Sequence, residues 1–239
     1  MSDARLFFRS FLERNTEPLI GIVSAKDVAM VCGELYAQEN GLTLATRELI
    51  AYYLPRESVL PDEETGAPQG KALLYPAPSG ELRQASPSDW QTIIKWIYAF
   101  YAETLRAAPP TAEPKRPDEK KPPSPVGKVE MYVWWDTRPV AMGMLTGTGD
   151  TCRLNLIFTP PRLRGKGYGR AIVAALSAHI RKNNQLPVLY TTADNIAANN
   201  LYTSMGFREA GRLTEVRFHT KSEIFKENHA QFHFENDES

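Results

Sequence analysis

The stretch Arg164-Gly165-Lys166-Gly167-Tyr168-Gly169 has the residue types of an anion-binding turn. Glycine carries no Cβ, so a ligand can approach the backbone N–H groups of this stretch closely. The alanine-rich segment that follows predicts a helix, and the N-terminus of a helix carries the positive end of its dipole. Backbone donors next to a helix N-terminus favour a phosphate group as the ligand.

Two common phosphate-binding motifs do not fit this turn. Pro160 occupies the position at which a Walker loop has its first glycine, and Gly167 stands where Ser or Thr would follow the lysine. The spacing of Gly165, Gly167 and Gly169 is G-x-G-x-G, which differs from the dinucleotide fingerprint G-x-G-x-x-G. Judged on the glycines alone, a simple turn between a strand and a helix remains the alternative.

Length and composition limit the classes of protein that the chain can belong to. Its 239 residues are 42% hydrophobic, which is enough for one large or two small domains. Lys and Arg number 28, as do Asp and Glu, and this zero net charge argues against a dedicated nucleic-acid-binding protein. Cys32 and Cys152 lie far apart, which predicts reduced thiols in an intracellular, cytoplasmic protein without a metal cluster. The apolar runs are too short to span a membrane, and the N-terminal residues lack the layout of a signal peptide.

Residues 1–78 are expected to form a mainly helical module. Apolar residues at helical spacing predict helices over residues 7–12 and 28–35. The apolar residues between positions 49 and 54 predict a further short helix that ends at Pro55. Nothing in this module has catalytic spacing, so packing or the shaping of a substrate site is its expected role.

A larger domain is expected over residues 80–220. A capping box of Ser88 with Gln91 predicts the start of one helix, and Asp194 is predicted to cap another. Residues 107–128, rich in Pro, Lys and Glu, predict a flexible insert, and residues 221–239 predict a polar tail. Alternating or apolar runs predict strands over residues 81–85, 129–135, 140–146, 151–158, 187–192 and 213–218.

The order of these elements and two sequence motifs resemble the GNAT superfamily of acyl-CoA-dependent N-acyltransferases over roughly residues 80–219. The glycine motif of that family, Arg/Gln-x-x-Gly-x-Gly/Ala, is met by Arg164, Gly167 and Gly169. The second signature is Asn-x-x-Ala-x-x-Leu-Tyr-x-x-x-Gly-Phe, and its fixed positions are met by Asn195, Ala198, Leu201, Tyr202, Gly206 and Phe207. The resemblance implies a mixed α/β fold with a mostly antiparallel sheet flanked by helices.

The resemblance also implies a ligand, acetyl-CoA, and a role for each motif. The cofactor would pass between the strand ending at Phe158 and the strand of residues 188–191, so these strands should not be paired along their whole length. The general acid for the departing thiolate would be Tyr202, for which a half-buried core tyrosine is the alternative. Asn195 would bond the pantetheine arm, with a helix N-cap as the alternative. The other implied cofactor-binding residues are Ile157, Phe158 and Thr159 at the pantetheine and thioester, Arg164, Gly165, Lys166, Gly167, Tyr168, Gly169 and Arg170 at the pyrophosphate, and Ala198 in the second signature.

The acceptor and the general base are not identified by these motifs. The predicted strand 151–158 carries no carboxylate, and the remaining base candidates are Asp150, Glu130, Glu103 and His219. A water-relayed proton, or an amine that arrives neutral, would need no dedicated base. The resemblance therefore implies transfer of an acetyl group to a primary amine within a ternary complex, without a nucleic acid or a membrane as partner. A catalytically silent acyl-CoA-binding or interaction module of the same fold is the alternative.

Overall fold

The computed structural model describes residues 2–14, 18–19, 21–58, 78–105 and 128–220, which fall into two compact units. The larger unit contains the described residues of 52–190 and 195–210, and the smaller unit contains those of 2–51, 191–194 and 211–220. The expected insert, apart from Lys128, and the expected polar tail lie outside the described residues. The predicted domain boundary near residue 79 stays a prediction.

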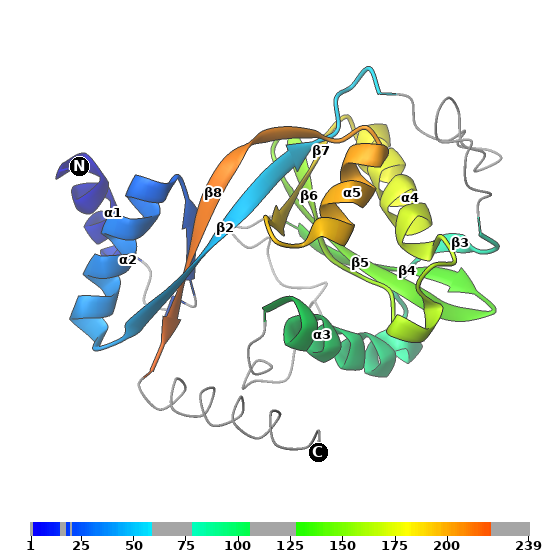
Figure 1. The fold of residues 1–239 in the computed structure, drawn as a ribbon, viewed down its shortest axis with the longest axis horizontal. Helices are drawn as coiled ribbons and strands as arrows, with labels where there is room; N and C mark the ends of the chain where they lie inside the picture. Colours follow the sequence, from blue (N-terminus) through cyan, green and yellow to red (C-terminus); the bar gives the residue numbers. More distant parts are fainter. Residues whose placement is uncertain (1, 15–17, 20, 59–77, 106–127, 221–239) are drawn as a thin grey trace, which may run out of the picture. The chain divides into compact units, whose positions relative to one another are not determined.

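The strands of the larger unit follow one another in the order β7-β6-β5-β4-β3 (Figure 1). Neighbouring strands in this series are antiparallel, except for the parallel pair β6 and β7. The mixed, mostly antiparallel fold that the sequence predicts is therefore confirmed. The strand bounds are Glu81–Gln84 for β3, Lys128–Asp136 for β4, Arg138–Thr148 for β5, Thr151–Phe158 for β6 and Leu186–Thr192 for β7.

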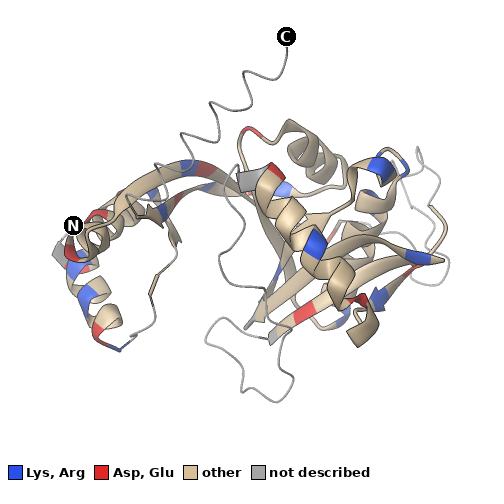
Figure 2. Ribbon diagram, turned by 90° about the horizontal axis from the view of Figure 1, so that it is seen from below, with Lys and Arg blue, Asp and Glu red and all other residues tan. Residues whose placement is uncertain are grey.

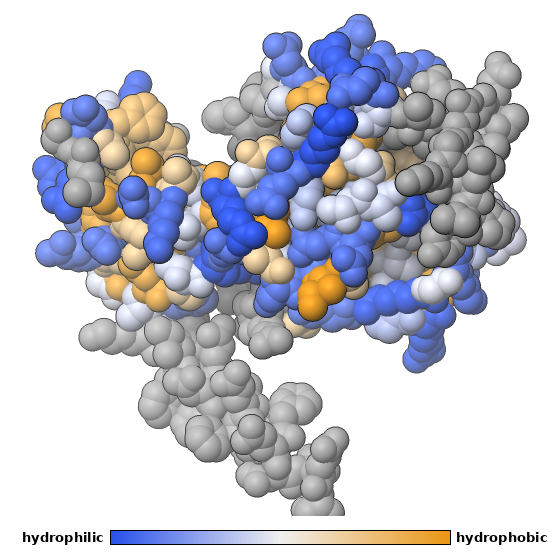
Figure 3. All heavy atoms as spheres, turned by 45° about the horizontal axis from the view of Figure 1, so that its top comes forward, coloured by the Kyte–Doolittle hydropathy of each residue, from blue (hydrophilic) through white to orange (hydrophobic). Residues whose placement is uncertain are grey.

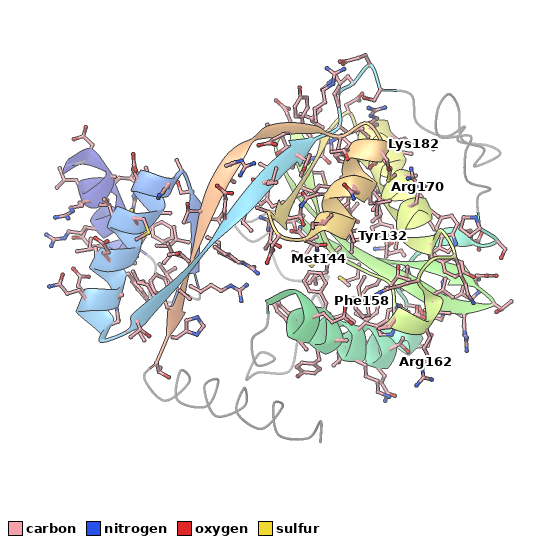
Figure 4. All side chains as sticks on the ribbon, viewed as in Figure 1. Tyr132, Met144, Phe158, Arg162, Arg170 and Lys182 are labelled. Atoms are coloured by element: carbon pink, nitrogen blue, oxygen red, sulfur yellow. The ribbon has the colours of Figure 1, made fainter. Side chains whose placement is uncertain are left out.

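Helices flank these strands on both sides: α3 (Trp90–Leu105), α4 (Tyr168–Lys182) and α5 (Ile196–Ser204). Ile93 and Ile97 of α3 share a buried core with Met142 and Phe158 of the sheet, and Figure 4 labels Phe158 beside this helix. The next residue of β5 after Met142 is Gly143, which meets Leu176 of α4. Because successive strand residues point to opposite faces, α3 and α4 cover opposite faces.

Side-chain hydrogen bonds refine the positions of the helices. The guanidinium of Arg170 in α4 donates to Ser204 Oγ of α5 at 2.7 Å, which holds α5 beside α4. The capping box before α3 is formed by Ser86 and Asp89, so the predicted box of Ser88 with Gln91 is wrong. A 3₁₀ turn, Pro87–Asp89, precedes the α-helix, and proline favours the first position of such a turn, which moves the cap two residues upstream.

The smaller unit combines α1 (Ser2–Arg14) and α2 (Lys26–Asn40) with β1 (Gly21–Ser24) and most of β2 (Thr43–Tyr53) and β8 (Arg208–His219). Its strand order is β1-β8-β2. Phe8 of α1 packs against Cys32 and Tyr36 of α2 in a small buried cluster. Ion pairs join β2 to β8, Arg47 with Glu215 and Glu48 with Arg212, and Figure 2 colours the acidic and basic residues along the ribbon.

The short helix predicted between residues 49 and 54 is wrong, because this stretch belongs to strand β2. Ile50, Tyr52 and Leu54 are buried while Ala51 and Tyr53 are less so, which is the two-residue period of a strand. The β-branched and aromatic residues of Thr43–Tyr53 also favour extended backbone. The adjacent pairs at 49–50 and 53–54 had fitted helical spacing equally well.

The surface of α1 carries apolar side chains that are not covered by the other described residues. Leu6 and Phe7 are 68% and 70% exposed, and Figure 3 shows apolar atoms at the surface of this helical region. Phe8, although adjacent, is buried. The apolar residues that predicted a helix over residues 7–12 are therefore only partly buried. Among the described residues, no helix is long and apolar enough to cross a membrane.

Candidate functional site

A gap in backbone pairing lies between the parallel strands β6 and β7. Their pairing runs from Thr151 opposite Leu186 to Leu154 opposite Leu189. Strand β6 continues to Phe158 and β7 to Thr192, but the residues of β6 after Leu154 have no partner in β7. The prediction that these two strands are not paired along their whole length is therefore confirmed. Unpaired peptide groups along this gap are available to a ligand that follows the strand.

A β-bulge in β6 coincides with the gap. Asn155 lies opposite Met144 of β5 and Phe158 lies opposite Met142, so Leu156 and Ile157 together face the single residue Gly143. Such an insertion bends the strand and turns its peptide groups. The bulge thereby accounts for the divergence of β6 from β7.

Two backbone features make the bulge possible. Leu156 has a φ of 48°, a conformation that costs about 1–3 kcal/mol for a residue other than glycine. A Cβ on Gly143 would lie 2.6 Å from Leu176 Cδ1 and 2.9 Å from Ile157 Cδ1, so a larger residue between the bulge and α4 would force these side chains to move. A glycine inside a predicted strand, here Gly143 in the stretch 140–146, is the sequence signal that could have indicated this bulge.

The predicted pantetheine-binding residues Ile157, Phe158 and Thr159 directly follow the bulge. The side chain of Phe158 is buried in the core beneath α3, where its ring lies 6.3 Å from that of Trp96. Only the backbone of Phe158 therefore remains for a ligand in the gap. The Thr159 carbonyl accepts a hydrogen bond from Arg164 Nε at 2.9 Å, which connects the end of β6 to the glycine turn.

The glycine turn opens α4 without a side-chain cap. Gly165 and Gly167 have φ angles of 74° and 86°, which other residues rarely adopt. Gly167 is the N-cap residue and has no side chain with which to accept from the first turn. The N–H group of Ala171 is bonded to the Gly167 carbonyl, so the N–H groups of Tyr168 and Gly169 precede this bond and have no acceptor within the helix. A negatively charged group is stabilised at such an end by the donors and by the helix dipole.

The basic side chains of the turn have different surroundings. Arg164 pairs with Glu103 of α3 at 2.5 Å, and its guanidinium lies 5.8 Å from the centre of the Phe158 ring. Arg170 is directed to Ser204 of α5, as its label in Figure 4 helps to locate. The side chain of Lys166 is exposed. The two arginines thus connect the turn to α3 and α5, a role that their position in the motif does not reveal.

The carboxylate of Asp136, at the turn between β4 and β5, also belongs to this region. Tyr168 Oη donates to Asp136 Oδ2 at 2.7 Å, and Ser79 Oγ donates to the same oxygen at 2.9 Å. These hydrogen bonds lower the pKa of Asp136, the bond from Tyr168 contributing most, followed by Ser79 and the nearby Lys166. Asp136 thereby ties the β4–β5 hairpin to the first residue of α4.

The second signature forms the start of α5. Asn195 is the N-cap residue, and its Oδ1 accepts from the Ala198 N–H at 3.1 Å. The prediction that Asp194 caps this helix is therefore wrong by one residue. The amide of Asn195 serves as a cap through its oxygen, whereas its role toward a pantetheine arm stays a prediction.

Tyr202 lies about two turns after Asn195 on α5 and is only 7% exposed. Its ring is 6.3 Å from that of Tyr52 and 5.8 Å from that of Phe207. Burial raises the pKa of the Tyr202 phenol to about 12, so the hydroxyl stays protonated throughout the neutral range. The group is therefore a hydrogen-bond donor in an apolar setting, and its predicted role as the acid stays a prediction.

The carboxylates that the sequence left as base candidates are dispersed. Glu103 is paired with Arg164, and Asp150 lies at the exposed end of the β5–β6 turn. Burial raises the pKa values of Tyr132 and Cys152, and the charge of Glu130 on β4 adds to both shifts. Among the described residues, no group of three His, Cys, Asp or Glu side chains is arranged to hold a metal ion.

Comparisons with known proteins agree with this fold. Residues 136–218 match the model of the FR47-like protein family. No curated protein matches the chain at a significant level. A solved structure from Novosphingobium aromaticivorans, named as an acetyltransferase of the GNAT family, is similar with a TM-score of 0.51 and 17% identity, over 76% of this chain and 68% of that one.

Two further solved structures extend the comparison. A Drosophila protein has a TM-score of 0.51 and 13% identity, and the match covers 82% of this chain and 60% of that one. A GNAT-family acetyltransferase from Colwellia psychrerythraea has a TM-score of 0.48 and 13% identity, over 92% of this chain and 73% of that one. At these identities the likeness concerns the fold. The likeness of fold to the Novosphingobium aromaticivorans structure and the family match over residues 136–218 confirm the resemblance to the GNAT superfamily that the two sequence motifs indicated.

Proposed function

We propose that this protein is an N-acyltransferase that transfers an acetyl group from acetyl-CoA to a primary amine. The observation that carries the proposal is the gap between β6 and β7 beside the uncapped start of α4. A gap lined by unpaired peptide groups suits the amides of a pantetheine arm, and a helix N-terminus suits a pyrophosphate. Acyl-CoA combines these two groups in one extended molecule.

In this proposal the cofactor is bound mainly by backbone groups. The N–H groups between Gly165 and Arg170 take the pyrophosphate. The peptide groups of Ile157, Phe158 and Thr159 take the pantetheine amides and the thioester carbonyl. Asn195 contributes its Nδ2, because its Oδ1 is already bonded to the Ala198 N–H. The bulge supports this arrangement by fixing the peptide groups after Leu156 in one orientation before the ligand arrives.

The proposed reaction is direct attack within a ternary complex. The nitrogen of the neutral amine forms a bond to the thioester carbon, the C–S bond breaks, and the electron pair leaves with sulfur. The amine proton passes to water, and the thiolate takes a proton from its surroundings. A backbone N–H aimed at the developing oxyanion can contribute about 3 kcal/mol to the stabilisation of the transition state.

Tyr202 is proposed to stabilise the leaving sulfur. With a pKa of about 12 the phenol is a weaker acid than a free tyrosine, whereas a thiol has a pKa of about 8.5. Complete proton transfer is therefore uphill, and the role that fits the buried hydroxyl is donation of a hydrogen bond to the departing thiolate. Final protonation can then come from solvent.

A catalytically silent acyl-CoA-binding module is the second candidate. Strand β6, Thr151–Phe158, has no carboxylate that could serve as a general base beside the gap. Direct attack by an amine that arrives neutral removes the need for such a base. The missing carboxylate is therefore compatible with both candidates, and an experiment has to distinguish them. The binding module would hold the same ligand without turnover.

Thermal unfolding with acetyl-CoA and with S-acetylpantetheine, followed by a thiol-release assay, tests the proposal. Acetyl-CoA at about one hundred times its Kd should stabilise the protein by roughly 2.7 kcal/mol. S-acetylpantetheine should stabilise it less at the same concentration, because it lacks the pyrophosphate. No shift with millimolar acetyl-CoA would refute both candidates. A shift without thiol release, across amines that include amino acids, polyamines and lysine peptides, would favour the binding module.

A further inference from the structure

Resting on the function proposed above, we propose that the acceptor is a small amine that also carries a carboxylate, and that Arg153 of β6 binds this carboxylate. The acceptor class that fits is an amino acid whose side-chain amine reacts. The proposal follows from the face of the sheet on which Arg153 lies, from its position at the end of the gap, and from its partners.

Arg153 lies on the face of the sheet that α3 covers in part. Asn155, two residues further along β6, is opposite Met144, and Met144 packs with the core beneath α3. Figure 4 labels Met144 and Phe158 on this side. Residues two apart in a strand share a face, so Arg153 and Asn155 both point to the α3 side. The helices α4 and α5 cover the opposite face.

This placement makes the α3 face the approach for the acceptor. The cofactor is proposed to enter from the side of the α4 N-terminus and to pass between β6 and β7. Its acyl group then reaches the opposite face, where an incoming amine meets the thioester carbon. Arg153 is one residue before Leu154, which is the last residue of β6 paired with β7, so its side chain lies at the edge of this opening.

The surroundings of Arg153 differ from those of Arg47 and Arg83, two other partly buried arginines. Arg47 and Arg83 are each paired with a carboxylate, Glu215 and Asp89 respectively. Arg153 instead has its guanidinium carbon 5.2 Å from the centre of the Tyr190 ring, and within the described part of the chain no carboxylate pairs with it.

Tyr190 is the first residue of β7 beyond the paired segment and is 38% exposed. A ring beside the guanidinium holds it through a cation–π contact and leaves its donor edge for another group. The planar fork of a guanidinium suits a carboxylate, which it binds through two parallel hydrogen bonds. The pair of Arg153 and Tyr190 therefore has the composition of a carboxylate-binding site at the opening of the gap.

The spacing along β6 limits the acceptor further. Arg153 is three residues before the bulge at Leu156, which corresponds to roughly 10 Å of strand. An amine and a carboxylate several bonds apart bridge such a distance better than the two groups of a simple α-amino acid. We therefore expect the side-chain amine of a basic amino acid, or an ω-amino acid, to be preferred.

A pair of acceptors with the same amine tests this inference. Acetyl transfer to 6-aminohexanoate is compared with transfer to its carboxamide, 6-aminohexanamide, in the wild type and in Arg153→Gln. We expect the wild type to prefer the carboxylate by about 10- to 100-fold in kcat/KM, as for a hydrogen bond to a charged group. Arg153→Gln should remove this preference, mainly through KM for the carboxylate. Tyr190→Phe, which keeps the ring, should retain it.

Controls separate this inference from the proposed function. Arg208→Gln removes an arginine from an exposed ion pair with Glu57 and should retain the preference for the carboxylate. The thermal shift of Arg153→Gln with acetyl-CoA should equal that of the wild type. If acetyl-CoA binds but the wild type does not prefer the carboxylate, or acetylates neither compound, the inference is wrong and cofactor binding stands. If acetyl-CoA does not bind the wild type, both fail together.

Discussion

The two helices that begin beside the β6–β7 gap start in different ways. At the N-terminus of α5 the side chain of Asn195 accepts from the Ala198 N–H, as in most protein helices. At the N-terminus of α4 the cap is Gly167, in a left-handed conformation, and no side chain accepts from the first turn. The first arrangement stabilises the helix by itself, whereas the second leaves donors unpaired. The difference indicates which helix end is built for a ligand.

The comparison can be tested by placing one charge at the same position of each helix. Gly169 and Ala197 are both the second residue of their helices, and a Cβ on Gly169 would meet Thr159 Oγ1 at an ordinary 3.5 Å. Gly169→Asp should weaken acetyl-CoA binding by about 100-fold or more, because a carboxylate would face the pyrophosphate. Ala197→Asp should weaken it by less than about threefold.

Calorimetric titration with acetyl-CoA measures both affinities. Each variant should unfold at or above the wild-type temperature without ligand, since an acidic residue in the first turn favours the helix dipole. Equal losses of affinity in the two variants would contradict the distinction between the helix ends.

Tyr202→Phe tests what α5 contributes apart from its capped start. Removal of the hydroxyl should lower kcat by about 100-fold, with little change in acetyl-CoA affinity, if the phenol stabilises the leaving thiolate. Steady-state kinetics in the wild type should show no loss of activity from deprotonation of Tyr202 between pH 7 and pH 10, because its pKa is about 12.

A second tyrosine supplies the control for this experiment. Tyr52 is equally buried and donates to Asn199 Oδ1 at 3.0 Å, so Tyr52→Phe also removes a buried hydroxyl beside α5. It should leave kcat within about threefold of the wild type. An undiminished kcat in Tyr202→Phe would refute the role of Tyr202.

Gly143→Ala tests the β-bulge in β6, which accompanies the gap between β6 and β7. The added methyl would meet Leu176 and Ile157 at 2.6 and 2.9 Å and should destabilise the protein by about 1–3 kcal/mol. Gly147→Ala on the same strand is the control, because its Cβ would meet Gln185 at 3.4 Å. Denaturant unfolding measures both, and equal stabilities would contradict the need for glycine opposite the bulge.

The smallest effect is expected at the cap of α5. Asn195→Ala should lower the free energy of unfolding by about 1 kcal/mol, because the Ala198 N–H loses its acceptor. Asn195→Asp keeps an acceptor oxygen and should retain this stability. It removes the Nδ2 donors, so a several-fold loss of acetyl-CoA affinity in Asn195→Asp would support contact with the pantetheine. An unchanged affinity would assign Asn195 to capping alone.

Much of the larger unit could be predicted from the sequence, for a physical reason. Strands such as Thr151–Phe158 alternate clearly, and the glycine turn combines residue types that only a strained, ligand-accessible backbone requires. The separation of β6 from β7 also followed from the two motifs, since the resemblance placed a ligand between those strands.

Other features depend on contacts between distant residues and could not be read locally. The strand conformation of β2 arises from pairing with a partner far along the chain, and its apolar residues fit helical spacing as well. The partners of Arg164, Arg170 and Asp136 come from other elements of the larger unit. The resemblance pointed to Arg164 and Arg170 but not to Asp136, and only the fold shows which groups hold the turn in place.

The pairing of β1 with β8 has a consequence for how the protein is made. Gly21 lies opposite Arg217, and Ser24 lies opposite Thr214. The first described strand, β1, can therefore pair only after the last described strand, β8, has been synthesised. During synthesis, α1, α2 and β1 leave the ribosome long before their partner exists. Contacts between such distant residues form slowly. We expect the smaller unit to be completed only after β8 has been released, which makes its exposed strand edge a natural binding site for a chaperone during synthesis.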